Sequence, residues 1–550
     1  MNKQKGISLF LILILILGTV LTGCRKQKTP TDDANTTPTM TEDSNTEQIL
    51  SISLDSEPDS LDVAKASDIN SQTILTQVME NLTRLEVGND GSDVVVPAMA
   101  ESWEHSDDGL VWTFKLRDAK WSDGKPVTAE DFVYGVQRTL DPETASPVAT
   151  LLEPIKNAEA IINGDMDVSK AGIEAIDEKT VQVTLEYACA HFLDLTYDRV
   201  MQPQRKDIVE KHGTSYGTEA DKLVFNGPFV VEEWVHNSHI TFSKNESYWD
   251  EKSVKLDKVN VKIISEETAL MGELQNGTID IADPSSAEWI GKLDESGQFD
   301  KITGFEARSH YIFFNQETEL FSNKKIRQAF SVSLDRETIQ NDIYQGIHMA
   351  AYGWVAPPVD IGTENFRKKA GDPVKELIDE NPDPKALFME GLKELGIDKD
   401  PSEIKIPLMV PNIEGREFPE YLQQLFNEKL GVNIELDIAE WPIFQERNRQ
   451  LDYVMGYKSK GGYYNDPMTF LDIWVTNAKI IPTGWSNKRY DNLIKEASLS
   501  VDNEERYEIF KEAERILVKE DTAIAPYSYE LRNTYVQKYV KGAMIPAFGP

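Results

Sequence analysis

Two patterns in the sequence match residues that perform chemistry in other proteins, but neither has the surroundings that the chemistry needs. Residues 213–217 read Gly-Thr-Ser-Tyr-Gly, the spacing of a hydrolase nucleophile turn. That turn requires an apolar strand before the serine and a helix after it. Here the flanking residues are polar and charged, so we interpret the segment as a surface loop.

His236 and His239 are three residues apart, a spacing that would let them share a metal ion on a helix. Their surroundings, VVEEWVHNSHITF, instead predict two strands joined by a turn. The sequence has no HExxH pattern, phosphate loop, dinucleotide fingerprint or acidic calcium loop. We therefore expect no enzyme activity, no metal and no cofactor.

The elements of the body alternate between strands and helices without a repeating period, which predicts an α/β fold with mixed sheets. Residues 110–117 and 180–186 alternate apolar and polar side chains, as half-buried strands do. Thr128 is expected to cap a helix, with Asp131 at its third position. Ser322 or Asn323 is expected to open a second helix, and Asp502 a third.

Length and charge limit the classes of function. The chain has 550 residues, too many for one ordinary domain, and a net charge of −36. This excess of acid argues against a nucleic-acid partner, because binding phosphates needs clustered Lys and Arg. With 40% hydrophobic residues the composition is globular, and two cysteines provide no disulfide framework.

The N-terminal residues predict export. Two lysines precede an apolar run from Ile7 to Leu21. This run is shorter than the ~20 residues of a membrane-spanning helix and is typical of a signal peptide. The run ends Leu-Thr-Gly-Cys24, which resembles a bacterial lipobox with Cys24 as the lipidated residue. We expect residues 1–24 to be a signal peptide and the polar, acidic residues 25–48 to be a flexible linker from a membrane anchor.

Linkers rich in Pro and Gly are scarce within the body, so we expect at least two lobes joined by strands that cross between them. The most loop-like internal stretch is 365–384, which contains FRKKAGDPVKELIDENPDP.

Residues 97–142 carry a long, specific pattern: PAMAESWEHSDDGLVWTFKLRDAKWSDGKPVTAEDFVYGVQRTLDP. This resembles the family 5 solute-binding proteins of ABC importers, the oligopeptide-binding group. Other segments similar to that family follow in order, among them NGPF at 226–229, NESYWD at 245–250, RQAF at 327–330 and YNDPMTFL at 464–471. The resemblance extends from about residue 49 to the C-terminus.

The resemblance implies a two-lobed periplasmic-binding-protein-like fold with an additional domain inserted in the first lobe. The implied ranges are 49–79, 184–311 and 524–550 for lobe I, 80–183 for the extra domain, and 312–523 for lobe II. It also implies a monomer that closes by hinge motion around a peptide. The resemblance further implies that the closed complex delivers its ligand to a membrane permease, with the permease subunits and their ATPases as partners. The binding protein itself is expected at the outer face of the cell membrane.

In relatives that bind peptides, a W-x-A-D segment precedes the YNDP-like motif, and its Asp binds the peptide amino group. The aligned positions here are Lys460, Gly461, Gly462 and Tyr463. Either Asp466 or Asp283 replaces that acid, or the chain does not anchor a free amino terminus. Lys460 either favours an acidic group of the ligand or points to solvent.

Four further positions fall where the family places cleft side chains. Glu440-Trp441 matches an E-W pair whose Trp reaches the ligand, while core packing of Trp441 is the alternative. His310 and Phe305 precede the second lobe, and Asp283 follows a predicted strand.

Three functions remain open: an importer component that captures peptides, a binder of another solute such as a metal chelate, a sugar or a signalling peptide, and an exported hydrolase.

Overall fold

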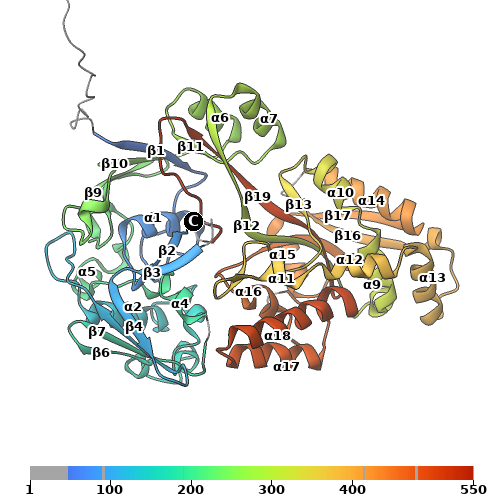
Figure 1. The fold of residues 1–550 in the computed structure, drawn as a ribbon, viewed down its shortest axis with the longest axis horizontal. Helices are drawn as coiled ribbons and strands as arrows, with labels where there is room; N and C mark the ends of the chain where they lie inside the picture. The colour runs from blue at the N-terminus through green and yellow to red at the C-terminus, as the bar shows by residue number, and fades with distance from the viewer. Residues whose placement is uncertain (1–46, 89–92, 190, 413–414, 477–480, 549–550) are drawn as a thin grey trace, which may run out of the picture. The chain divides into compact units, whose positions relative to one another are not determined.

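The structure is a computed structural model that describes residues 47–88, 93–189, 191–412, 415–476 and 481–548. In these ranges the chain forms two lobes, each with a sheet that combines parallel and antiparallel strand pairs (Figure 1). The α/β class with mixed sheets is therefore confirmed. Among the described residues, no helix has both the length and the apolar composition to cross a bilayer.

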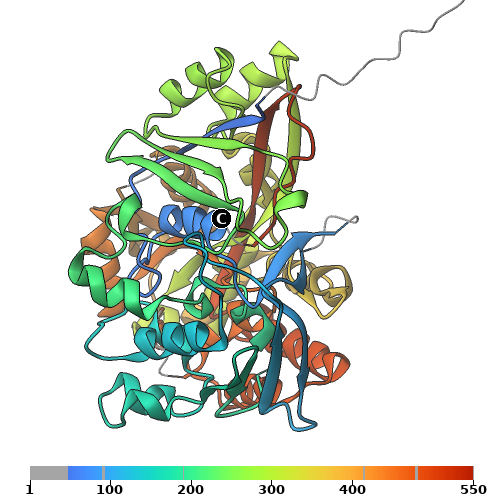
Figure 2. The ribbon, with the colours of Figure 1, turned by 90° about the vertical axis from the view of Figure 1, so that its left-hand side faces the viewer.

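The first lobe is built on a four-stranded sheet in which one parallel pair lies beside two antiparallel pairs. Figure 2 shows these blue and green strands facing the viewer. The turn predicted at His236 and His239 connects its last two strands. In spatial order the strands are β1 (Ile49–Leu54), β10 (Lys258–Ile263), β9 (His239–Lys244) and β8 (Phe229–Val235).

An antiparallel sheet and a capped helix fill the expected insertion. The predicted alternation is confirmed, because Trp112, Phe114 and Val181 are buried along the strands. The capping box is also present: the Thr128 side chain meets the backbone of the third helical residue, and Asp131 accepts from the Thr128 N–H. The strands are β4 (Ala100–His105), β5 (Val111–Leu116), β7 (Thr180–Thr184) and β6 (Ile173–Asp177), the helix is α2 (Ala129–Leu140), and β2 (Thr83–Val87) pairs with β3 (Asp93–Pro97).

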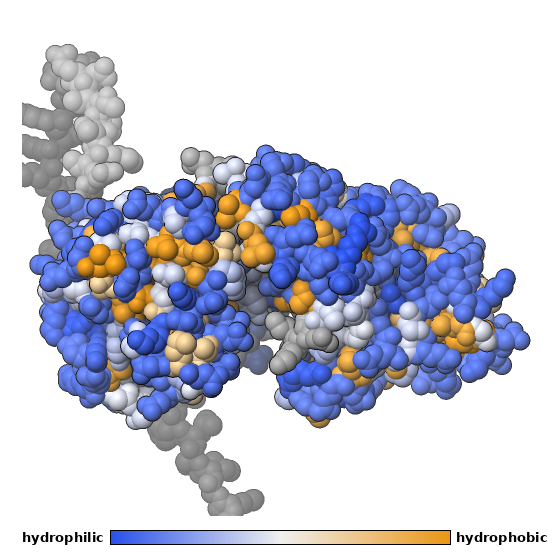
Figure 3. Space-filling model, turned by 90° about the horizontal axis from the view of Figure 1, so that it is seen from below, coloured by the Kyte–Doolittle hydropathy of each residue, from blue (hydrophilic) through white to orange (hydrophobic). Residues whose placement is uncertain are grey.

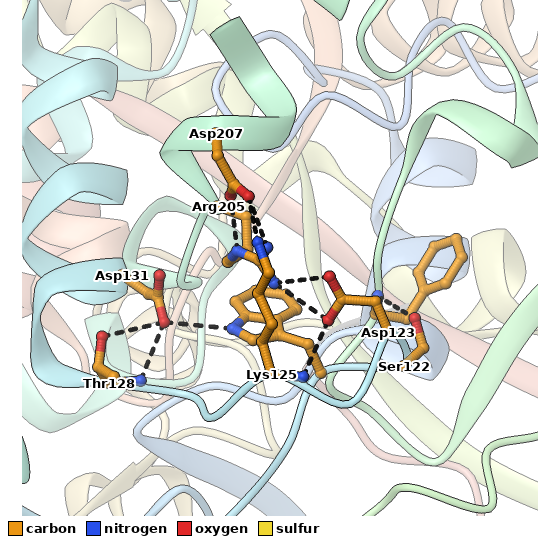
Figure 4. Close-up of polar contacts among 9 residues, drawn as sticks. Ser122, Asp123, Lys125, Thr128, Asp131, Arg205 and Asp207 are labelled. Carbon is orange, nitrogen blue, oxygen red and sulfur yellow. Dashed lines mark hydrogen bonds and ion pairs between the residues drawn. The ribbon is translucent and has the colours of Figure 1, made fainter. Parts of the chain in front are cut away.

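Polar contacts fix the turn that carries the Trp-Ser-Asp-Gly pattern (Figure 4). Arg205 donates to Asp207 from Nε at 2.8 Å and to Asp123 from Nη1 at 3.1 Å. These bonds hold the pKa of both carboxyls below the usual range, against burial that raises it at Asp123. Trp121 is fully buried, and its ring N–H donates to Asp131. The pattern therefore joins the turn to the N-terminus of α2.

The second lobe is built on the largest sheet. In spatial order its strands are β11 (Ile281–Ala282), β19 (Ile524–Gln537), β12 (Phe299–Phe314), β18 (Met455–Gly461), β16 (Lys405–Pro411) and β17 (Asn433–Ala439), and β13 (His348–Ala350) adds to β19. A small separate pair is β14 (Asp360–Ile361) with β15 (Glu364–Asn365).

Helices cover both faces of this sheet, and two apolar cores lie between helices and strands. The predicted helices are confirmed, with Asn323 capping α9 and Asp502 capping α18. The longer helices of this lobe are α9 (Lys324–Ser333), α12 (Pro373–Glu380), α13 (Pro384–Glu394), α14 (Glu417–Leu430), α15 (Trp441–Arg449), α17 (Lys488–Leu499) and α18 (Asn503–Arg515).

Shorter helices complete both lobes. In the first half of the chain these are α1 (Ile69–Val78), α3 (Ala158–Ile162), α4 (Phe192–Leu195), α5 (Lys206–His212), α6 (Glu267–Gln275) and α7 (Ala287–Ser296). In the second half they are α8 (Glu319–Ser322), α10 (Arg336–Thr338), α11 (Phe366–Ala370) and α16 (Met468–Leu471).

Two long antiparallel strands, β12 and β19, run from the helices α6 and α7 into the second lobe (Figure 1). Their register extends from Phe299 opposite Gln537 to Phe313 opposite Ile524. It is interrupted between Phe305 and Ser309, where three residues of β12 stand against one residue of β19. We call this interruption, residues 306–308, the ribbon bulge.

The prediction of a loop over 365–384 was wrong, because α11, α12 and the first residue of α13 occupy this stretch. Two of its three prolines open helices: Pro373 and Pro384 are first helical residues, where the missing N–H breaks no bond. Asn365 also acts as a cap, accepting from the Lys368 N–H.

The predicted signal peptide, Cys24 and the linker as far as residue 46 lie outside the described residues. Gln48, at the end of that linker, is docked on the first lobe, where its carbonyl accepts from the Asp257 N–H at 2.8 Å. The surface seen in Figure 3 is mostly hydrophilic, with apolar residues in small separate groups. This agrees with the acidic composition.

Candidate ligand cavity between the lobes

A cavity of about 710 Å³ is lined by residues of both lobes. Its volume lies in the range of small-molecule and peptide sites. One wall comes from the start of α1, a turn near residue 150 and the segment after α4. The other comes from the ribbon bulge and the end of β18. The walls include Gln72, Val148, Leu151, Asp194, Tyr197, Asp198, Glu306, Ala307, Arg308, Ser459, Lys460, Gly461, Gly462, Tyr463, Tyr464, Arg532 and Phe548.

Strand β18 brings the family-aligned positions to this cavity. It pairs with β12, placing Lys460 opposite Ser309 and Gly461 opposite Arg308. On its other side β16 pairs only with Met455 and Gly456, so no strand of the described part of the chain pairs with Lys458–Gly461 there. The end of β18 is therefore an open sheet edge beside the cavity.

Gly462 continues this edge in a crowded place. Its N–H donates to the carbonyl of Ala307 at 2.7 Å, inside the ribbon bulge. A Cβ on Gly462 would lie 2.9 Å from the Phe470 ring and 3.0 Å from the Phe548 ring. A residue larger than glycine would push these rings and change the floor of the cavity.

The wall from the second lobe is basic. Lys460 is only 7% exposed, so it does not point to solvent. Its ammonium donates to the Gly461 carbonyl and lies 3.8 Å from the centre of the Tyr463 ring. Burial lowers the pKa of Lys460 to about 8, with Arg308 adding to the effect and Asp472 opposing it. No carboxylate of the described residues forms an ion pair with it.

Arg308 and Arg532 extend the basic wall, and both have acidic partners. Arg308 lies 3.1 Å from Glu306 and 3.1 Å from Glu530, while Arg532 lies 3.9 Å from Glu306. Lys460 is thus the cation of this wall whose charge has no neutralising partner within 4.0 Å among the described residues.

The wall from the first lobe carries two acidic residues, Asp194 and Asp198, together with Arg199. Burial raises the pKa of Asp194 well above its usual value, and the charge of Asp466 adds to this rise. Burial also raises the pKa of Asp198, opposed by Arg199. The Asp194 carboxyl forms no ion pair among the described residues. A cation placed beside Asp194 would restore its ionised form.

An aromatic pair joins the lobes next to the cavity. The rings of His191 and Tyr464 are stacked, with centroids 4.2 Å apart and planes 5° from parallel. Burial lowers the pKa of His191 to about 4, so its ring is neutral at pH 7. The stack holds the segment before α4 against the segment after β18.

The predicted site residues divide into two groups. Lys460, Gly461, Gly462 and Tyr463 line the cavity together. Asp466 does not line it: it is buried in an ion pair with Arg506, 2.8 Å away, which ties the loop to α18. Asp283 is exposed in the loop after β11 and also lies away from the cavity walls.

The other predicted residues occupy three different places. Trp441 is the first residue of α15, 38% exposed and stacked on Phe444, and does not line this cavity. Phe305 lines a neighbouring cavity of about 770 Å³. Ala547 lines both this cavity and the cavity between the lobes. His310 is buried beside Glu530 on the far side of Arg308. A ligand-binding role for these residues remains a prediction.

Sequence reasoning missed Asp194 and Arg308. Asp194 follows the buried Phe192 in a segment without a motif, and nothing in its spacing marks it. Arg308 lies two residues before the predicted cleft residue His310. The bulge that brings Arg308 to the cavity is visible only in the pairing of β12 with β19.

The rejected hydrolase pattern lies elsewhere on the first lobe. Ser215 is in a single helical turn that follows α5, where its hydroxyl donates to the His212 carbonyl at 2.9 Å. The element directly before this turn is the helix α5 and not the apolar strand that precedes a nucleophile turn.

Comparisons with known proteins agree with this geometry. The chain is 32% identical over 500 residues to the dipeptide-binding protein DppE of Bacillus subtilis, covering 90% of each chain. It superposes on OppA of Listeria monocytogenes bound to peptide with a TM-score of 0.70 and 29% identity, covering 92% of this chain and 97% of that one. For the murein tripeptide-binding protein MppA in its unliganded open form, the TM-score is 0.76 with 28% identity and coverage of 90% and 94%. Residues 94–481 match the middle region of the bacterial extracellular solute-binding proteins, family 5. With two lobes, a cavity between them and this match over most of its length, the chain belongs to the family 5 solute-binding proteins of ABC importers.

Proposed function

We propose that this protein captures peptides in the cavity between its lobes for import by an ABC transporter. The observation that carries the proposal is an acid on one wall of the cavity and a lysine on the other, each available to a group of opposite charge on a ligand. Asp194 lacks an ion-pair partner on one wall and Lys460 lacks one on the other, among the described residues. A peptide with a free amino group and a free carboxylate supplies both missing charges.

The open edge of β18 supports an extended peptide. Backbone N–H and C=O groups at a sheet edge bind a strand of any sequence, whereas side chains of the ligand enter pockets beside it. The relatives are described as binding dipeptides, oligopeptides or murein tripeptides. Recognition through the backbone and the two ends of the peptide would make the site tolerant of sequence.

Hinge closure is part of the proposal. Solved relatives include one described as an unliganded open form and one described as bound to peptide, and a cavity lined by both lobes of this chain is compatible with such a motion. A peptide that pairs with both walls would bind the closed state more tightly, and this difference in affinity shifts the equilibrium toward closure.

We also propose that the mature protein is a monomer held by lipid on Cys24 at the outer face of the membrane, with permease subunits and their ATPases as partners. The lipobox and the polar linker support this. Cys24→Ser should move the protein from the membrane fraction to the medium or soluble envelope fraction. Complete retention in the membrane fraction after this change would contradict the anchor.

Native mass spectrometry of protein purified from its cells tests the ligand class first. We expect a set of co-purifying peptides with a common length and varied sequence. A single non-peptide adduct would overturn the peptide proposal in favour of another solute. Shortened peptides produced with turnover would identify a hydrolase.

Calorimetry with synthetic peptides of that length then tests the two walls. Acetylation of the amino end and Asp194→Asn should each weaken binding about 30-fold or more, and the two effects should not add, because both remove the same pair. Amidation of the carboxyl end and Lys460→Met should behave in the same way. Asp165→Asn is the matched control for an exposed carboxylate outside the cavity; an equal loss in this variant would refute the role of Asp194.

A further inference from the structure

A second cluster of side chains, outside the set that lines the cavity, could bind a metal ion. His310, His348 and Glu530 each offer one ligand atom, and these three atoms lie within 4.8 Å of one another. They come from β12, β13 and β19. His348 is directly opposite Glu530, and His310 is opposite Ser528, two residues from Glu530 on the same face. The sheet register, not a sequence motif, brings the three together.

The three side chains are enclosed and close together. Both histidines are 8% exposed, and Glu530 is partly buried. His310 Nε2 lies 3.1 Å from a carboxylate oxygen of Glu530. Imidazole nitrogen and carboxylate oxygen are common ligands of divalent transition metals.

We propose that His310, His348 and Glu530 form a binding site for a divalent transition-metal ion, with Zn²⁺ as the best-fitting ion. Two imidazoles and one carboxylate are a common set of protein ligands for zinc, and they leave a fourth position for water. Imidazole nitrogen disfavours Ca²⁺ and Mg²⁺, which prefer oxygen. Tetrahedral ligands at a bond length of ~2.1 Å lie about 3.4 Å apart. His310 Nε2 and the Glu530 oxygen already meet this spacing at 3.1 Å, and the distances to His348, which are within 4.8 Å, need to shorten by at most about 1.4 Å.

The neighbours of His348 hold its ring in place. Its Nδ1 lies 3.0 Å from the Ser528 hydroxyl oxygen, and the Tyr344 ring is stacked on it with centroids 3.8 Å apart. Partners of this kind fix the orientation of a ligating ring and raise its affinity for metal. Nε2 is then the nitrogen of His348 that remains for the ion.

Arg308 is the competitor of the metal, since its Nε lies 3.1 Å from Glu530. Glu306 is the other carboxylate beside this arginine, 3.1 Å away. A bound cation would weaken the pair between Arg308 and Glu530 and leave Glu306 as the remaining partner. Because Arg308 lines the cavity, metal occupancy would make the basic wall more available to an anionic group of the ligand.

Titration with ZnCl2 tests the site in mature protein prepared without a histidine tag and stripped with a chelator. Calorimetry at pH 7.5 should show one strong equivalent. His310→Gln and His348→Gln should each weaken it about 10- to 100-fold, a typical loss when a zinc ligand or its support is removed. Co²⁺ in place of Zn²⁺ should give the intense visible absorption of a four-coordinate ion, and both variants should lose it.

His236→Gln is the matched control, because His236 is also a histidine beside carboxylates, 2.8 Å from Glu57 and 3.5 Å from Glu219, but it is exposed. It should leave zinc affinity unchanged. The proposal is overturned if no stoichiometric zinc binds, or if binding survives both His310→Gln and His348→Gln. Glu530→Gln provides a further loss-of-ligand variant if either histidine variant fails to fold by circular dichroism.

Discussion

Replacing Lys460 with methionine should stabilise the ligand-free protein while it weakens peptide binding. Methionine has a similar length and no charge, so the change removes the buried ammonium with little loss of packing. In the native structure burial lowers the pKa of Lys460 from 10.5 to about 8. The charged form is therefore less stable in the folded protein than in the unfolded chain.

The size of the effect follows from that difference. A fall in pKa from 10.5 to about 8 corresponds to about 3 kcal/mol at pH values below 8, where lysine is charged in both states. The contact of the ammonium with the Tyr463 ring is worth about 0.5–1 kcal/mol at such an exposed ring and offsets part of it. We expect Lys460→Met to raise the free energy of unfolding by about 2 kcal/mol at pH 7.

The stability difference between Lys460→Met and wild type should depend on pH. Between pH 8 and 10.5 the native lysine is deprotonated while the unfolded one still binds a proton, so the native penalty disappears as pH rises. The advantage of the variant should fall from about 2 kcal/mol at pH 7 to near zero above pH 10.5. Urea unfolding of ligand-free wild type and variant across this range measures it.

Lys458→Met is the control for the assay. Burial also lowers the pKa of Lys458 to about 8, but its ammonium donates to Asn448 at 2.6 Å and does not line the cavity. Its peptide affinity should stay at the wild-type level. The reasoning is refuted if folded Lys460→Met is no more stable than wild type at pH 7, or if its gain stays constant from pH 7 to 10.5.

Three further predictions concern ion pairs and one ring. Asp466→Asn should cost about 3–5 kcal/mol in urea unfolding, since it leaves the buried Arg506 unpaired; an unchanged stability with lost peptide affinity would make Asp466 a ligand residue instead. Asp62→Asn should cost a similar amount, because Asp62 accepts from both terminal nitrogens of Arg138 at 2.6 and 2.7 Å; equal midpoints for variant and wild type would contradict this. The pKa of His191 is about 4 in the folded protein and 6.5 in its ordinary range. Below pH 6.5 the unfolded chain binds a proton at this histidine that the folded protein does not bind. The free energy of unfolding is therefore complete above pH 6.5 and falls as pH drops toward 4, by about 2 kcal/mol at pH 5. His191→Phe should lessen the acid sensitivity of unfolding, and an unaltered pH profile would exclude this cause.

The sequence was sufficient for features determined by neighbours along the chain. Strand β5 and helix α2 follow from alternation of apolar residues and from the Thr128 cap, whose partners are within three residues. Cavity positions aligned with a motif, Lys460 to Tyr463, were also identified. In each case the deciding contacts or the family pattern are local.

The remaining features depend on residues that are far apart in the sequence. Asp194 and Lys460 form opposite walls of one cavity across 266 positions, and His348 and Glu530 meet through the register of β13 with β19. Asp466 looked like a binding acid beside the motif, but Arg506 from α18 pairs with it. No local pattern encodes such partners, because they depend on how distant strands and helices pack.

The ribbon bulge has a mechanical consequence. The long strands β12 and β19 connect the lobes. Residues 306–308 interrupt the pairing of these strands at the point where Arg308 reaches the cavity. A ribbon bends most easily where cross-strand bonds are missing. If the lobes close on a ligand as proposed above, these three residues are both the place where the strand pair bends and part of the surface that the ligand contacts, so a ligand that pulls on Arg308 acts directly on the hinge. Lengthening or shortening this segment by one residue should change the affinity for the ligand and the movement of the lobes together.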